Sequence, residues 1–460
     1  MRLQSPWRPR LADNAASPSD RLVMALADDI LEGRLPSGAR VPAHRDLAYQ
    51  LGIGVGTVTK AYAVLERRGL VRSVKGRGTF VAVAVARRGD SVDLSVNTPP
   101  PMLGEHLLAQ TLETISRQVD PVLFTTYPPA VGHDEHRRLL AYWFEGLGMV
   151  VRPENLILCS GAQQALNIAF SVAIPPRGTI LTEALTYPGA IALARHARYR
   201  LTGIAMDDEG MMPDALEQAL AARTDRSQPV AVYVTPTMHN PTTATMGYAR
   251  RVEIARICRH HDVLVIEDDV YALTAAAEFP PIAMLAPERT FYVNSLSKTL
   301  SPGLRIGGLA VPPGWMDQAE TALRATGQMV SPLSCAVMGQ WLSDGTASSI
   351  RGAIRREAGR RRSVARHILG AAMHLPNHDG FHVWLPMDRQ AAHHVAHAAA
   401  SLGIIVTPPA AIAVDPDGPA SGIRLCLGAV MPGILPDTLA QIARIITHRQ
   451  NTPLPAHPSV

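Results

Sequence analysis

The chain has 460 residues, 47% hydrophobic and 18% charged, as is ordinary for a globular protein with two or three domains. No apolar run reaches the length of a membrane span, and the basic N-terminus lacks the apolar stretch of a signal peptide, so we expect no membrane segment. The four cysteines lie far apart, without metal-ligand spacing. We therefore expect no disulfide framework, no metal site and a reducing cytoplasm.

The net charge of +5 is unevenly placed along the chain. Residues 21–77 hold ten Lys or Arg and five Asp or Glu, so the basic excess lies there and the remainder is neutral. This asymmetry predicts an N-terminal module with a polyanionic partner, attached to a neutral body.

The N-terminal module is predicted over residues 17–85, after a disordered lead-in at 1–16. Its apolar pattern predicts three helices and two strands: a first helix capped by Ser19 or Asp20 and ended by Gly33, then His44–Leu51, Val55–Arg68, Leu70–Val74 and Gly78–Val83. Three helices and a basic two-stranded wing are typical of a winged helix-turn-helix, an α+β fold.

Several motifs of this module resemble the GntR family of bacterial DNA-binding domains: Leu35–Pro42, Arg45–Ala48, Gly56–Tyr62, Gly69-Leu70 and Gly76–Val81. The resemblance implies that the third helix enters the major groove of double-stranded operator DNA and that the wing touches the backbone. The candidate DNA contacts are Arg45, Thr57, Thr59, Lys60 and Arg77; for each arginine, a solvated surface charge is the alternative. Gly54 and Val55 stand where many members carry Ser-Arg, so operator specificity is not carried over.

A linker is predicted over residues 86–104, a body over 105–450 and a loose tail over 451–460. In the body, helical patterns alternate with short apolar strands at Leu156–Leu158, Thr179–Leu181, Val230–Val234, Val263–Ile266 and Phe291–Val293. This alternation predicts an α/β domain with a mainly parallel sheet. A run of arginines between 351 and 366 has helical spacing, which favours a solvated helix over a second nucleic-acid patch.

Polar residues follow four of these strands, where function concentrates in such sheets. Ser160-Gly161-Ala162, Asn240, Asp268 with Tyr271, and Lys298 each come shortly after a strand. Pyridoxal phosphate needs an amine for its aldehyde, a carboxylate for its pyridine nitrogen, a donor for its phenolic oxygen and an anion site for its phosphate. One ligand therefore accounts for all four strand ends.

The body resembles the fold-type I aminotransferases of class I/II, which implies an α/β pyridoxal-phosphate-dependent transferase-like domain with a smaller C-terminal α+β subdomain. Lys298 then matches the lysine that binds the cofactor aldehyde, Asp268 the partner of the pyridine nitrogen, and Tyr271 with Asn240 the pair at the phenolic oxygen. The resemblance implies further roles: a phosphate cradle at Ser160, Gly161, Ala162, Ser295 and Arg305, ring stacking by Tyr187, a contact from Tyr127 to the partner subunit's phosphate in a homodimer, and Arg424 for a substrate α-carboxylate. Asn97, His133 and His136 depart from the family pattern near the substrate.

A GntR-type module joined to an aminotransferase-like body resembles the MocR subfamily of transcriptional regulators. The resemblance implies a pyridoxal-phosphate-dependent regulator that binds operator DNA as a homodimer and senses an amino compound or a vitamer. An active class I/II aminotransferase with an accessory DNA-binding domain is the alternative, because Lys298, Asp268 and Arg424 are all present. A body that serves only as a dimerisation platform conflicts with the intact lysine, aspartate and asparagine.

Overall fold

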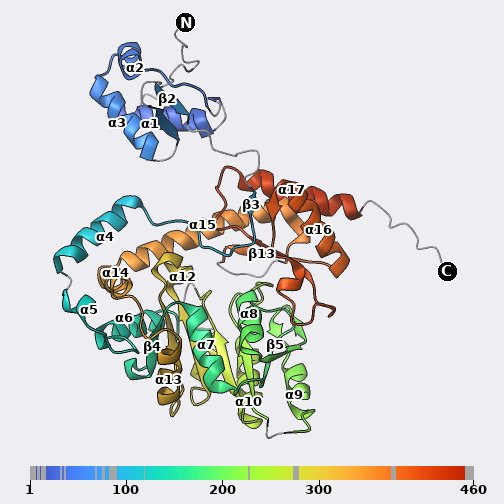
Figure 1. Ribbon diagram of the computed structural model, residues 1–460. Coiled ribbons are helices and arrows are strands. Elements are labelled where there is room, and N and C mark those ends of the chain that lie inside the picture. Colours follow the sequence, from blue (N-terminus) through green and yellow to red (C-terminus); the bar gives the residue numbers. More distant parts are fainter. Residues whose placement is uncertain are drawn as a thin grey trace. The chain divides into compact units, whose positions relative to one another are not determined.

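The protein is described by a computed structural model (Figure 1), in which the chain divides into two compact units, Met1–Ser91 and Val92–Val460. The described residues are 7, 11, 17–31, 34–35, 38–67, 70–74, 78–81, 91–118, 120–225, 228–272, 279–374 and 380–450. Within these ranges, none of the helices combines the length and the apolar character that a membrane span requires.

The first unit contains three helices and a two-stranded antiparallel wing, as the sequence predicts: α1 (Pro18–Leu31), α2 (His44–Leu51), α3 (Val55–Arg67), β1 (Val71–Val74) and β2 (Gly78–Val81). Leu22 and Leu26 of α1 pack with Val58 and Leu65 of α3, and all four are fully buried because the apolar stripes face one another. Gly52 adopts φ +62° and ends α2, which makes the turn into α3. Gly33 and Arg77 lie outside the described residues.

The second unit is organised around a seven-stranded sheet in the order β4-β12-β11-β10-β9-β5-β6. Its strands are β4 (Leu156–Cys159), β5 (Thr179–Glu183), β6 (Arg200–Ile204), β9 (Val230–Val234), β10 (Leu264–Asp268), β11 (Thr290–Ser295) and β12 (Gly307–Ala310). Only β12 runs antiparallel to its neighbours β11 and β4. The mainly parallel sheet confirms the prediction, although β6 and β12 had not been predicted as strands.

Helices cover both faces of this sheet. Ala231 and Tyr233 of β9 belong to one buried cluster and Val232 and Val234 to another, since successive side chains of a strand point to opposite faces. The helices before the C-terminal region are α4 (Glu105–Gln118), α5 (Val122–Thr125), α6 (Asp134–Glu145), α7 (Ala162–Ala173), α8 (Pro188–Ala197), α9 (Pro213–Ala221), α10 (Tyr248–His260), α11 (Ile282–Leu285), α12 (Leu296–Thr299), α13 (Met316–Thr326) and α14 (Pro332–Ser343).

The C-terminal region forms a smaller α+β subdomain, also as predicted (Figure 1). Its elements are α15 (Thr346–Leu369), β13 (His382–Pro386), α16 (Arg389–Ser401), β14 (Ile404–Ile405), β15 (Gly422–Cys426) and α17 (Leu435–Gln450). A short strand from before the sheet, β3 (Val92–Asp93), pairs in parallel with β14, and the following Leu94 is fully buried in the subdomain core. The predicted linker, 86–104, therefore reaches too far, because the chain from Val92 onward already packs in the second unit.

The arginine run on α15 also differs from the prediction of a solvated helix. Arg355, Arg356, Arg360 and Arg366 are exposed, but Arg361 is only 4% exposed and its Nη1 donates to the backbone oxygens of residues 427, 428 and 430 at 2.6–2.9 Å. This arginine thus holds a buried loop, which its position in a charged run did not reveal.

Candidate functional site

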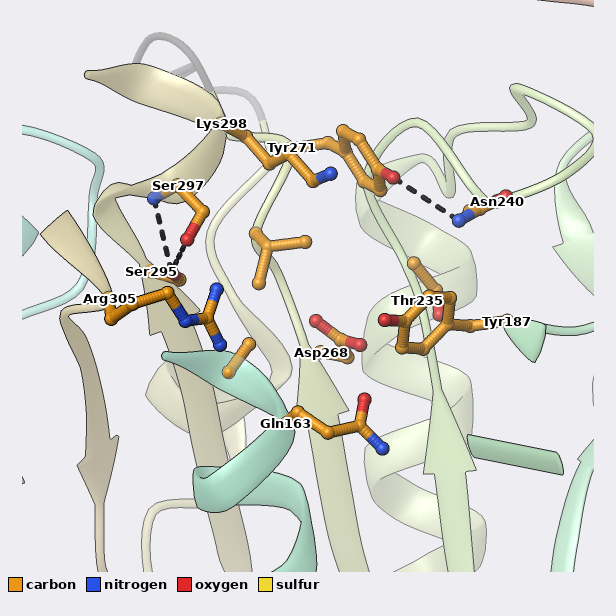
Figure 2. Close-up of a pocket in the computed structure, with 12 residues that line it drawn as sticks. Gln163, Tyr187, Thr235, Asn240, Asp268, Tyr271, Ser295, Ser297, Lys298 and Arg305 are labelled. Atoms are coloured by element: carbon orange, nitrogen blue, oxygen red, sulfur yellow. Dashed lines mark hydrogen bonds between the residues drawn. The ribbon is translucent and has the colours of Figure 1, made fainter. Parts of the chain in front are cut away.

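A pocket lies where the predicted strand ends converge (Figure 2). Its lining residues come from α7, β10, β11 and α12 and from the segments that follow β5, β9, β10 and α12: Ala162, Gln163, Tyr187, Thr235, Asn240, Asp268, Val270, Tyr271, Ser295, Ser297, Lys298 and Arg305. Eight of the residues predicted for the cofactor are therefore in one cavity.

Lys298 extends into this pocket from the short helix α12 (Figure 2). The helix is capped by Ser295, whose Oγ accepts from the Ser297 N–H at 3.1 Å. The Lys298 Nζ donates to the backbone carbonyl of Asn97 and lies 5.6 Å from the centre of the Tyr271 ring. Burial lowers the pKa of Lys298 to about 8, which Arg424 and Arg305 assist and Cys426 and Asp268 oppose. About a tenth of the amine is thus neutral and nucleophilic at pH 7.

Asp268 ends β10 with one carboxylate oxygen engaged and the other open. Its Oδ2 accepts a hydrogen bond from the Tyr233 hydroxyl at 2.9 Å, whereas Oδ1 is buried without a hydrogen-bond partner among the described residues. Burial raises the pKa of Asp268 to about 6, so the group is mostly ionised at pH 7. A buried acceptor without a donor is costly, and a protonated pyridine nitrogen in the pocket would satisfy it.

The Tyr271 hydroxyl is held by two amides. It accepts from Asn240 Nδ2 at 3.2 Å and from Asn97 Nδ2 at 2.9 Å, and burial raises the pKa of Tyr271. The phenol therefore stays protonated, and its own hydrogen remains available to an acceptor such as a phenolate oxygen in the pocket.

The opposite side of the pocket provides an anion site at the start of α7. Gly161 adopts φ +82°, and a Cβ there would lie 2.6 Å from Arg305 Nη2, so the guanidinium fits against a residue that must lack a side chain. Arg305 Nη2 donates to the Ser160 carbonyl at 3.1 Å. Backbone N–H groups at a helix start and a guanidinium together suit a phosphate. Ala162, Ser295 and Arg305 line the cavity, whereas Ser160 and Gly161 do not.

The structure places the three remaining predicted residues differently: Tyr187 lines the pocket, Arg424 is buried outside its lining, and Tyr127 is exposed. Tyr187 lines the pocket, and a Cβ on Gly189 would lie 2.3 Å from its ring, so that glycine makes room for it. Arg424 is buried but does not line the pocket, and it donates to Asn240 Oδ1 at 2.5 Å, the Ser95 carbonyl at 2.6 Å and the Thr407 hydroxyl at 2.7 Å. Tyr127 is 84% exposed and does not line this pocket.

The sequence reasoning missed several residues of the site. Gln163, Thr235, Val270 and Ser297 line the cavity, and all follow the same strand ends, so this rule would have found them. Tyr233 lies one residue before the end of β9, and only its hydrogen bond to Asp268 reveals its part in the site. Of the acids beside Asp268, Glu267 accepts from the backbone N–H groups of residues 282 and 283, which gives it a structural role.

One group of potential metal ligands comes together within the described parts of the chain, at Glu217, His260 and His261. His261 Nε2 is 2.6 Å from Glu217 Oε1, and the Arg256 guanidinium is 3.4 Å from the same carboxylate. An ion pair with arginine and a histidine hydrogen bond already occupy this carboxylate, so the cluster has its own structural role.

The predicted DNA contacts lie on α2 and α3. Arg45, Thr59 and Lys60 are exposed and Thr57 is half-buried. The Thr59 hydroxyl donates to the Val55 carbonyl at 3.0 Å and lies 3.2 Å from His44 Nδ1, so part of its bonding capacity is used within the unit. Arg77 is outside the described residues.

Comparisons with known proteins agree with this geometry. Residues 89–441 match the family "Aminotransferase class I and II", and residues 18–81 match "Bacterial regulatory proteins, gntR family". The chain is 29% identical to the HTH-type transcriptional regulator YisV of Bacillus subtilis, over 83% of this chain and 86% of the relative. It is 27% identical to the vitamin B6 salvage pathway transcriptional repressor PtsJ of Salmonella typhimurium, over 88% of this chain and 93% of the relative.

Among solved structures, an archaeal alanine:glyoxylate aminotransferase superimposes with a TM-score of 0.70 at 21% identity, covering 86% of this chain and 95% of that structure. At this identity the likeness establishes the fold. Together with the two family matches, it confirms the predicted architecture. The chain therefore belongs to the class I and II aminotransferase family and carries a gntR-family DNA-binding domain at its N-terminus, an organisation consistent with the MocR subfamily.

Proposed function

We propose that this protein is a pyridoxal-phosphate-dependent transcriptional regulator, in which the first unit binds operator DNA and the second senses an amino compound or a vitamer. One observation carries the proposal: a gntR-family domain shares a chain with a pocket whose buried Asp268 Oδ1 has no hydrogen-bond partner in the described structure. The name of PtsJ, which links that relative to vitamin B6 salvage, supports a vitamer as ligand.

The pocket residues fit the cofactor group by group. Lys298 would provide the amine for the aldehyde, Asp268 Oδ1 would pair with the pyridine nitrogen, and the Tyr271 hydroxyl would serve the phenolic oxygen. The start of α7 with Ser295 and Arg305 would receive the phosphate, and Tyr187 would stack on the ring. When bound, the cofactor supplies an electron sink for an amino group attached to it. Arg424, the predicted carboxylate partner, would have to exchange one of its present bonds for an effector carboxylate.

The DNA-binding part of the proposal rests on the domain at residues 17–85, with Arg45, Thr57, Thr59, Lys60 and Arg77 as contacts. A homodimer is the expected state, because a two-fold symmetric protein matches two operator half-sites. The exposed Tyr127 is the residue we expect to reach the partner subunit's phosphate site. All four cysteines are unpaired and buried, which agrees with the expected cytoplasmic location.

The test combines a cofactor readout with a DNA readout. Purified protein mixed with pyridoxal phosphate should develop an absorbance band near the visible edge, and Lys298→Ala should abolish it. A mobility-shift assay on the protein's own upstream region should then respond to pyridoxal phosphate or to a panel of amino compounds. A colourless protein whose DNA binding ignores the cofactor would reduce the body to a dimerisation platform and defeat the proposal.

A second candidate function is an active class I/II aminotransferase with an accessory DNA-binding domain. Lys298 and Asp268 line one pocket, Arg424 donates to its lining residue Asn240, and Arg424 Nε is buried without a hydrogen-bond partner in the described structure. Ping-pong turnover of an amino acid and a keto acid at about 1–1,000 per second would favour this function. A single half-reaction with the amino acid, without sustained turnover, would favour the regulator.

A further inference from the structure

The segment 92–98, which we call the strap, is the first part of the second unit after the chain leaves the DNA-binding unit. At its start, Val92 N–H donates to the Gly403 carbonyl at 2.8 Å and Leu94 N–H to the Ile405 carbonyl at 2.8 Å. The Leu94 carbonyl accepts from the Cys426 N–H at 2.8 Å. The strap is therefore bonded on two sides to β14 and β15 of the C-terminal subdomain.

A few residues later, the same strap reaches the cofactor pocket. Ser95 O accepts from Arg424, and Asn97 O accepts from Lys298 Nζ. The Asn97 side chain donates to the Tyr271 hydroxyl at 2.9 Å and lies 3.1 Å from His382 Nδ1. Two of the residues assigned to the cofactor thus bond directly to Asn97, which is 8% exposed.

We propose that Asn97 is the positioning residue through which the state of Lys298 is transmitted along the strap to the DNA-binding unit. This inference rests on the proposed function, because it explains how occupancy of the pocket reaches the operator. Residues 82–91 alone separate the strap from β2 of the DNA-binding unit. A change in how firmly the strap is held therefore acts on a short connection.

The reaction of the Lys298 amine with an aldehyde changes how firmly the strap is held. When its amine condenses with an aldehyde, a C=N bond forms and water leaves with two amine hydrogens, so at most one N–H remains. A remaining N–H would be directed toward the bound group, so the Asn97 carbonyl would lose its donor. A buried carbonyl without a donor is unfavourable, which drives the strap to rearrange. The strap is thus held in the cofactor-free protein and released in the loaded one.

The test uses two Lys298 variants that both lack covalent capture but differ in their donors. Lys298→Met has similar length and no N–H, so it should mimic the released strap. Lys298→Arg keeps N–H donors for the Asn97 carbonyl, so it should mimic the held strap. Hydrogen exchange of the Val92 and Leu94 amides should be faster in the Met variant. The DNA affinities of the two variants should differ by about fivefold or more, the size of ordinary coupling between sites.

The two variants are compared with the wild-type protein, with and without pyridoxal phosphate. The Met variant should match wild type loaded with pyridoxal phosphate, the Arg variant should match wild type without it, and neither should respond to added cofactor. Val96→Ala is the matched control, since Val96 lies on the strap with its side chain 54% exposed, and it should keep the wild-type response. If the Arg variant is unstable by thermal unfolding, Lys298→Gln replaces it, because its amide also donates.

Equal exchange and equal DNA affinity in the two variants would overturn the inference while leaving the regulator intact, provided that wild type still responds to pyridoxal phosphate. A strap that loosens without any change in DNA affinity would overturn it as well. A wild-type protein that takes up no cofactor and shows no response would instead remove the proposed function, and the inference with it.

Discussion

The cofactor pocket and the DNA-binding face carry their polar groups in opposite ways. In the pocket, Asp268, Tyr271 and Asn240 are buried and bonded to neighbours, and an open charged acceptor, Asp268 Oδ1, indicates the kind of ligand that the pocket requires. On the DNA-binding face, Arg45 and Lys60 are exposed to solvent. A buried site thus identifies its ligand through unsatisfied groups, whereas an exposed basic face identifies only the charge of its partner.

Among the variants considered, we expect Asp268→Asn to have the largest effect, which is on the affinity of the pocket for pyridoxal phosphate. The amide keeps the shape and a partner for Tyr233 but loses the charge opposite the pyridine nitrogen. A hydrogen bond to a charged group contributes about 1.5–3 kcal/mol, so affinity for pyridoxal phosphate should fall about 10- to 150-fold. Absorbance titration measures it. As a control, Asp262→Asn changes an acid whose side chain is 95% exposed, and it should leave the affinity for pyridoxal phosphate unchanged. Without cofactor, both variants should bind DNA like the wild-type protein.

Gly161→Ala should weaken the anion side of the pocket in particular. The backbone at φ +82° disfavours a side chain, and the new Cβ would displace the Arg305 guanidinium 2.6 Å away. We expect about tenfold weaker binding of pyridoxal phosphate, from a strain of about 1–2 kcal/mol, and little change for pyridoxal, which lacks the phosphate. Gly359→Ala, on α15 with open space around the Cβ position, is the matched control and should only stabilise the fold. Equal losses for both ligands would contradict an anion site at Arg305.

The pH dependence of cofactor capture should report on Lys298. Its pKa is lowered to about 8, and only the neutral amine attacks an aldehyde, so capture should accelerate as pH rises and level off above 8. Between pH 8 and pH 7 the neutral fraction falls about fivefold, and stopped-flow absorbance should show the same ratio. A profile that still climbs steeply above pH 9 would mean that the amine is solvated rather than buried.

The pocket was largely predictable because the ends of parallel strands meet at one edge of a sheet, which brings Asn240, Asp268 and Lys298 together from separate segments. The contact between Lys298 and Asn97 could not be predicted in this way, because it joins positions 201 residues apart through the packing of the C-terminal subdomain. The burial of Arg361 depends on the same packing. Periodicity reports which face of an element is apolar, and carries no information on which distant carbonyl a polar group will meet.

The DNA-binding face should show the smallest single-residue effects, because its contacts are exposed and screened. Lys60→Ala should weaken operator binding about two- to fivefold, the size of an exposed ion pair, and reduce the slope of log affinity against log salt by about 1. Fluorescence anisotropy across a salt series separates the two quantities. Arg366→Ala removes an exposed charge of α15 and should change neither the affinity nor the slope. A loss equal to that of Lys60→Ala would make α15 a second nucleic-acid surface, and the division between a DNA-binding unit and a sensing unit would then no longer hold.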